Sequence, residues 1–276
     1  MEFSKHRESF RRHLIENECC QTTISKYMHD LRCFELFVGE RDIDKQLVLE
    51  YKQDLINRYE KSSANSMLAA LNSFFRFVGW HHCIVKRFQI QREVYCDESL
   101  ELTEKEYIKL LNAAKSNGND RLYFLLQTIC GTGIRVSELA FFTVEAVQRG
   151  KVIITCKGKT RTVFIVSKLK DKLLQYVRRN NISSGPVFVT KTGKSIDRSN
   201  IWREMKKLCI LAKVSSKKVF PHNLRHLFAR AFYKIEKDIA KLADVLGHSS
   251  IDTTRIYIVS SGIEHRRQME NMRLII

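Results

Sequence analysis

The sequence has few residues that interrupt secondary structure, because only 2 of its 276 residues are proline and 11 are glycine. Apolar residues make up 44% and recur along the chain, which argues against intrinsic disorder. No apolar run approaches the roughly 18 residues that a membrane-spanning helix needs. The start, MEFSKHRESFRRH, lacks the apolar core of a signal peptide. These absences predict an ordered, cytoplasmic protein that does not enter a membrane.

The eight cysteines include no CxxC pair of the kind that marks zinc and redox sites. In a chain of this length without an export signal, we expect reduced and mostly buried thiols. His222 and His226 have the spacing of the HExxH zinc helix, but Asn223 stands where that motif has its glutamate. The HHC cluster at residues 81–83 has no second ligand pair at a recognised spacing. The sequence therefore predicts no metal site.

Positive charge is what the sequence has in excess, with 48 Lys and Arg against 30 Asp and Glu, a net charge of +18. This excess is larger than solubility requires and indicates a polyanionic partner. Residues 1–95 hold 15 basic and 13 acidic side chains, a net charge of +2. Residues 96–276 hold the other 33 basic and 17 acidic side chains, a net charge of +16. The second part is therefore the better candidate for contact with a polyanion.

The first part is predicted to be a small helical bundle, because apolar residues form three stripes at helical spacing. The stripes run from Ile24 to Val38, from Leu47 to Tyr59 and from Met67 to Val78. We expect the first helix to be capped by Thr22 or Thr23, the second to begin after Asp44, and the third after a break at Ser62-Ser63. The stretch QREVYCDESL at residues 91–100 lacks this periodicity, which predicts two domains, 1–95 and 96–276.

The second part is predicted to be mainly helical with a small β-hairpin, an α+β arrangement. Thr103 and Glu106 fit a capping box at the start of a helix. A buried helix is expected around 122–129, and two β-rich runs, 152–155 and 162–166, flank a short basic turn at 156–161. A short strand at 187–190 and helices at about 198–212, 222–235, 238–246 and 251–259 complete the expected order.

Four local signals stand out in the second part, although each has a plain structural interpretation of its own. In GTGIRVSEL, Arg135 follows a glycine-broken turn and leads into a helix, where it could simply pair with Glu138. In PHNLRH, a proline opens a helix whose first turn carries His222 and Arg225 on one face. The other two are the histidine of LGHSS and the tyrosine of TTRIYI. Alone, the histidine suggests a capping or surface residue, and the tyrosine a core or interface residue. These are His248 and Tyr257.

Taken together and in this order, the signals resemble the tyrosine recombinase (phage integrase) family. GTGIRVSEL, CKGK, PHNLRH and LGHSSIDTTRIY match its motifs, and the separations of 26 residues from His222 to His248 and nine from there to Tyr257 also fit. The resemblance covers about residues 101–260. The helical first part is similar to the family's core-binding domain, so the two domains would form a clamp around DNA.

The resemblance implies a role for each matching side chain. Tyr257 would be the nucleophile, His222 would accept its proton or hold the phosphate, and His248 would donate a hydrogen bond to a phosphate oxygen. Arg135 and Arg225 would neutralise the two nonbridging oxygens. Glu138 would orient the turn that carries Arg135.

The remaining role, protonation of the leaving 5′ oxygen, is implied for a hairpin lysine. The turn here is one residue shorter than the family's common GKGxK pattern, so Lys157 and Lys159 compete for it. We assign Lys157 because it directly precedes Gly158, as the family's catalytic lysine precedes its glycine. The family conserves bond energy in a 3′-phosphotyrosyl linkage, so the resemblance implies neither a metal nor any other cofactor.

The expected activity is site-specific recombination of double-stranded DNA by a homotetramer through a Holliday junction, with the integrase of a mobile element as the first choice. A Xer-type chromosome or plasmid dimer resolvase is the alternative. A type IB topoisomerase and a DNA-binding regulator without activity are further possibilities. The tail after Tyr257 ends in an amphipathic stretch that could dock on a neighbouring protomer, or fold back on its own domain.

Overall fold

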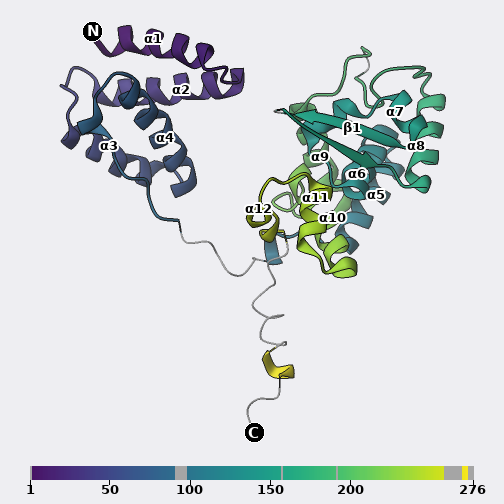
Figure 1. Ribbon diagram of the computed structural model, residues 1–276. Helices are drawn as coiled ribbons and strands as arrows, with labels where there is room; N and C mark the ends of the chain where they lie inside the picture. The colour runs from purple at the N-terminus through teal and green to yellow at the C-terminus, as the bar shows by residue number, and fades with distance from the viewer. Residues whose placement is uncertain (1, 91–97, 157, 191, 258–268, 273–276) are drawn as a thin grey trace. The chain divides into compact units, whose positions relative to one another are not determined.

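The structure is a computed structural model, and it describes residues 2–90, 98–156, 158–190, 192–257 and 269–272 (Figure 1). The chain divides into two compact units, Met1–Arg92 and Glu93–Ile276. Each unit has a hydrophobic core of its own. The expected boundary between residues 95 and 96 lies outside the described residues. Within the described ranges, no helix is long and apolar enough to cross a membrane.

The first unit is a helical bundle around a core rich in phenylalanine. Its elements are α1 (Glu2–Glu16), α2 (Gln21–Val38), α3 (Lys45–Arg58), α4 (Lys61–Phe77) and the short 3-10 helix η1 (His81–Cys83). Phe34 lies at the centre, with its ring centroid 5.0 Å from that of Tyr51 and 6.0 Å from that of Phe75. The prediction of a small helical bundle in the first part is confirmed.

The helix starts of this unit were predicted with mixed success. Asp44 caps α3 as expected, because its side chain accepts a hydrogen bond from the backbone of Leu47. The N-cap position of α2 is Cys20, so the prediction of Thr22 or Thr23 is wrong. The break at residues 62–63 is also wrong, since both serines lie inside α4. Two serines weaken a helix only slightly, and the buried face of α4 outweighs that preference.

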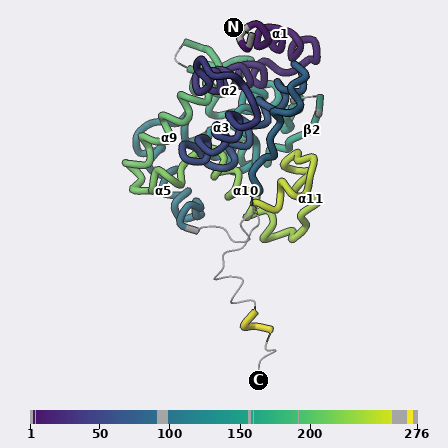
Figure 2. Tube along the Cα trace, turned by 90° about the vertical axis from the view of Figure 1, so that its left-hand side faces the viewer, coloured from purple at the N-terminus to yellow at the C-terminus, as the bar shows by residue number. Residues whose placement is uncertain are grey.

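The second unit is helical apart from a β-hairpin. Its elements are η2 (Glu98–Leu100), α5 (Glu104–Ser116), α6 (Asp120–Thr132), η3 (Val136–Phe141), α7 (Val144–Arg149), β1 (Lys151–Cys156), β2 (Lys159–Phe164), α8 (Ser167–Arg179), α9 (Arg198–Ala212), α10 (Pro221–Glu236), α11 (Ile239–Leu246) and α12 (Ile251–Arg255). Helix α6 packs against α5, α8 and α10. Helix α11 lies beside α10 (Figure 2). The capping box of Thr103 and Glu106 is present at the start of α5, as predicted. This mainly helical fold with a two-stranded sheet confirms the expected fold class.

The hairpin is tighter than the sequence suggested. Cys156 pairs with Lys159 in the antiparallel ladder, so only residues 157 and 158 join the strands. The predicted turn over 156–161 is therefore too long. Gly158 has a φ of +72°, which other residues rarely adopt. A glycine at this position permits a two-residue connection and lets the strands extend towards it.

Other differences concern one expected strand and three helices. The expected strand at 187–190 is represented only by isolated bridges, Thr143 to Pro186 and Val189 to Ser195. Helix α12 ends at Arg255, before the predicted end, and residues 258–259 lie outside the described residues. Helices α7 and α8 were not predicted, although α8 has a clear apolar face. That face comprises Leu169, Leu173, Tyr176 and Val177.

Candidate active site

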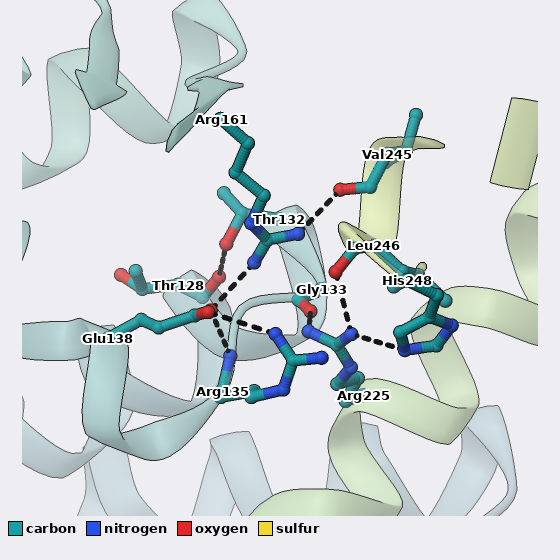
Figure 3. Close-up of polar contacts among 10 residues, drawn as sticks. All are labelled: Thr128, Thr132, Gly133, Arg135, Glu138, Arg161, Arg225, Val245, Leu246 and His248. Atoms are coloured by element: carbon teal, nitrogen blue, oxygen red, sulfur yellow. Dashed lines mark hydrogen bonds and ion pairs between the residues drawn. The ribbon is translucent and has the colours of Figure 1, made fainter. Parts of the chain in front are cut away.

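Helix α10 places Arg225 in the interior of the second unit. Pro221 occupies the first turn, where a missing backbone N–H costs nothing, and Arg225 lies one turn further on. The Arg225 side chain is fully buried. Its Nη1 donates to the carbonyl of Gly133 at 2.6 Å, and its Nη2 donates to the carbonyl of Leu246 at 2.8 Å. The guanidinium therefore ties the turn after α6 to the end of α11 (Figure 3).

Gly133 makes this arrangement possible. Its φ is +65°, which ends α6 in the left-handed conformation. A Cβ at this position would overlap the ring of Phe228 on α10. The glycine therefore allows α10 to approach closely enough for Arg225 to reach the carbonyl.

His248 follows Gly247, which ends α11 in the left-handed conformation. Arg225 Nη2 lies 2.8 Å from His248 Nε2. Because a guanidinium only donates, Nε2 accepts this bond, and Nδ1 carries the hydrogen and donates to Thr254 Oγ1 at 2.8 Å. Burial, with Arg225 nearby, lowers the pKa of His248 to about 4. A bond from Nε2 to a phosphate oxygen would need a proton on that nitrogen, so the implied donor role stays a prediction.

Tyr257 is buried and lies among three histidine rings. Its ring centroid is 5.6 Å from that of His222, 4.4 Å from that of His226 and 5.4 Å from that of His248. The hydroxyl is 3.4 Å from Nε2 of His222. Burial, with positive charge nearby, lowers the pKa of His222 to about 4, so the ring is neutral near pH 7. In the tautomer with a bare Nε2, it accepts the hydrogen of the tyrosine hydroxyl.

Arg135 is held by a single carboxylate. Glu138 accepts hydrogen bonds from the backbone N–H of Arg135 at 2.7 Å and from its Nη1 at 3.0 Å. Glu138 is 5% exposed, whereas the Arg135 side chain is 43% exposed. Arg135 directly precedes the 3-10 helix η3, so the glycine-broken turn leads into a short helix, as predicted. The predicted contact between these two residues is present (Figure 3).

The sequence of the second unit matches the description "Phage integrase family" over residues 101–262, more than half of the chain. Residues 8–82 match the "Phage integrase, N-terminal SAM-like domain". The chain belongs to the phage integrase family. Its enzyme class is thus that of the tyrosine-type site-specific DNA recombinases. Tyrosine recombinase XerA of Pyrococcus furiosus is 31% identical over 230 residues, which are 78% of this chain and 77% of XerA.

Solved integrase structures share the fold of this family member. A lambda integrase tetramer bound to a Holliday junction matches with a TM-score of 0.75 at 16% identity, over 92% of this chain and 76% of that chain. The Tn1549 transposon integrase in complex with transposon right end DNA also has a TM-score of 0.75, at 12% identity. That match covers 98% of this chain and 99% of the Tn1549 chain.

The integrase site is strongly positive. Burial, with Arg135 as the next cause, lowers the pKa of Arg225 to about 10, which leaves the group charged at pH 7. Glu138 contacts Arg135 and also Arg161, whose Nη2 donates to it at 2.7 Å. Two guanidinium groups therefore share one carboxylate, and the buried guanidinium of Arg225 adds a third positive charge. Such a site favours an anion with more than one charged oxygen.

The structure brings five of the six predicted site residues together in the second unit. Those five are Arg135, His222, Arg225, His248 and Tyr257. Lys157 lies outside the described residues, and Lys159 begins β2, so the choice between them stays a prediction. Sequence reasoning missed Arg161 and Thr254, because nothing in their spacing marks them. No group of three or more ligating side chains that could hold a metal occurs within the described part of the chain.

Proposed function

We propose that this recombinase cleaves one DNA strand with Tyr257 and keeps the broken end as a 3′-phosphotyrosyl ester. The observation that carries this proposal is the buried tyrosine hydroxyl at 3.4 Å from His222 Nε2. His222 takes the phenolic proton as the oxygen attacks the phosphorus. The bond from phosphorus to the 5′ oxygen breaks in the same step. A partner strand's 5′ hydroxyl later attacks the ester in reverse, so bond energy is conserved.

Arg135 and Arg225 stabilise the charge that grows on the nonbridging oxygens. Arg225 is fixed by two carbonyls, so it needs little reorganisation when that charge develops. Its buried Nε has no hydrogen-bond partner within the described structure. Arg135, 43% exposed, can move onto a phosphate oxygen. Preorganised donors of this kind lower a barrier by about 3–4 kcal/mol each.

The leaving 5′ oxygen is a poor alkoxide and needs a proton. We assign that proton to Lys157, which precedes the hairpin glycine. The support is its place in the sequence directly before Gly158, in the hairpin between β1 and β2. Lys159 then contacts the DNA backbone.

We further propose that four protomers act on two duplexes in the cytoplasm and exchange strands through a Holliday junction. The support is the shared fold with the lambda integrase tetramer bound to such a junction. The tail docks on a neighbouring protomer in this assembly. Of the tail, only residues 269–272 are described, and Met269 and Met272 are exposed there.

The biological role that we propose is integration and excision of a mobile element. The fold shared with the Tn1549 transposon integrase over 98% of this chain supports it. A Xer-type resolvase is the second candidate, favoured by the 31% identity to XerA.

Plasmid assays separate these roles. Two plasmids that carry the DNA flanking the chain's own gene should recombine at a fixed position if it is a mobile-element integrase. Recombination only between chromosomal dimer-resolution sites would establish the Xer role instead. Relaxation of supercoils without exchange would show a topoisomerase and overturn the proposal.

A further inference from the structure

Arg161 on strand β2 has a place in the site that the sequence did not reveal. Its Cα pairs with Ile154 in the hairpin, two residues beyond the start of β2. Its side chain is 14% exposed and points towards Glu138 and Val245 (Figure 3). Nη2 donates to Glu138 at 2.7 Å, and Nη1 donates to the carbonyl of Val245 at 2.8 Å.

These two contacts repeat the connection that Arg225 makes from α10. Arg225 joins Gly133 to Leu246, and Arg161 joins Glu138 to Val245. Two guanidinium groups from different elements therefore bridge the same two segments, residues 133–138 and the end of α11. One turn carries Arg135, and the other leads to His248.

The second turn is also packed against Arg161. A Cβ on Gly247 would overlap the Cδ of Arg161, so this glycine accommodates the aliphatic part of the arginine directly before His248. Glu138 accepts three hydrogen bonds, from the backbone N–H and the side chain of Arg135 and from the side chain of Arg161. A shift of Arg161 would move both the carboxylate that orients Arg135 and the turn that orients His248.

We propose that Arg161 is a positioning residue, which sets the spacing between Arg135 and His248 so that both meet the nonbridging oxygens of one phosphate. This inference rests on the proposed function. Arg161 acts through the protein in this proposal, since its two terminal nitrogens hold Glu138 and the carbonyl of Val245. Its effect on the reaction passes through Glu138 and through the turn at Val245.

The test substitution is Arg161→Lys, which keeps the charge but loses the fork that reaches two partners at once. Arg121 supplies a matched control in the same unit. Its Nη2 donates to Glu204 at 2.5 Å and its Nη1 to the carbonyl of Val189 at 2.8 Å, and its buried Nε, like that of Arg161, has no partner within the described structure. Arg121→Lys therefore removes the same kind of partly buried fork away from the site.

The measurement is single-turnover formation of covalent protein–DNA complex on a nicked duplex, with melting temperature and DNA affinity measured alongside. We expect both variants to lose a similar amount of thermal stability and to bind DNA nearly as well as the wild type. Arg161→Lys should form the complex about 10- to 100-fold more slowly, the scale of a misplaced catalytic group. Arg121→Lys should be slowed less than about threefold. Equal slowing in both variants would overturn the proposal.

Two modified substrates identify which groups Arg161 positions. A methylphosphonate has one nonbridging oxygen replaced by a methyl group and carries no charge there, so it depends less on the arginines. The defect of Arg161→Lys should shrink on this substrate. A 5′-bridging sulfur leaves without a proton and should not relieve the defect. Two results would contradict the proposed route of action. One is a smaller defect of Arg161→Lys on the sulfur substrate, and the other is an unchanged defect on the methylphosphonate.

A second pair of variants keeps the test decisive if Arg161→Lys fails to fold. Arg161→Gln and Glu138→Gln, singly and together, should show coupled losses in cleavage, so the double variant is no slower than the slower single variant. Additive losses would contradict the proposal. A wild-type protein that forms no covalent complex would refute the proposed function instead, so the two failures are distinguishable.

Discussion

His222 and His248 are uncharged at neutral pH because both are buried beside guanidinium groups, which lowers the pKa of each to about 4. In the unfolded chain both titrate near pH 6.5. Between these values the unfolded state binds more protons than the folded state, so stability falls as the pH is lowered through this window. At neutral pH both rings are uncharged, so this loss of stability does not occur.

We therefore predict that the melting temperature of the wild type falls between pH 6.5 and 4 more steeply than that of His222→Gln. Glutamine stays neutral throughout, so it removes one proton-linked group. Thermal melts at several pH values measure this. His82→Gln, at an exposed position of the first unit, is the control and should leave the slope unchanged. Equal slopes for His222→Gln and the wild type would show that His222 titrates normally.

The hairpin lysines can be separated by the leaving group. Lys157→Ala should slow cleavage about 10²- to 10⁴-fold, the scale of a general acid. A 5′-bridging sulfur needs no proton to leave, so cleavage by this variant should recover on that substrate. The loss of cleavage rate in Arg135→Ala and Arg225→Ala should persist on the sulfur substrate. If cleavage by Lys159→Ala recovers on the sulfur substrate instead, the general acid is Lys159, two residues further along the chain.

At the scale of the elements, the turn after α6 connects Arg135 with Arg225, because the carbonyl of Gly133 in this turn accepts a hydrogen bond from Arg225. Gly133→Ala should destabilise the protein by about 1–3 kcal/mol, because a Cβ at a φ of +65° is strained and overlaps Phe228. Gly131→Ala is the control, since its Cβ would lie in ordinary contact 3.6 Å from Leu169. It should be neutral or stabilising by up to about 1 kcal/mol. Chemical denaturation of both variants checks this, and equal effects would contradict it.

Elements that carry strong local signals were predictable from the sequence. The capping residues Asp44 and Thr103 fix two helix starts by hydrogen bonds within three residues, so the sequence alone locates them. The resemblance of the site motifs to the family likewise led to Arg225 and Tyr257. Arg161 could not be found this way, because its partner Val245 is 84 residues away and contributes only a backbone carbonyl. Any residue supplies such a carbonyl, so no side-chain pattern marks the contact.

At the scale of the whole molecule, the uneven charge predicts unequal roles in DNA binding. The second unit has its own hydrophobic core and holds nearly all of the positive excess. Glu93–Ile276 alone should bind duplex DNA with a strong salt dependence, because phosphate contacts release counterions. It should discriminate its site less well than the full chain, since the helical unit is absent. Binding titrations at several salt concentrations measure both properties, and undiminished discrimination would contradict a two-domain clamp.

The central claim is that Tyr257 is the nucleophile that attacks the DNA. Covalent trapping on a nicked duplex tests this claim most directly. Tyr257→Phe removes one hydroxyl from a buried ring and should abolish the covalent complex while DNA binding stays nearly intact. Tyr233→Phe is the matched control, because Tyr233 packs against the same small cluster as Tyr257 and should still allow trapping. A covalent complex formed by Tyr257→Phe would contradict the account.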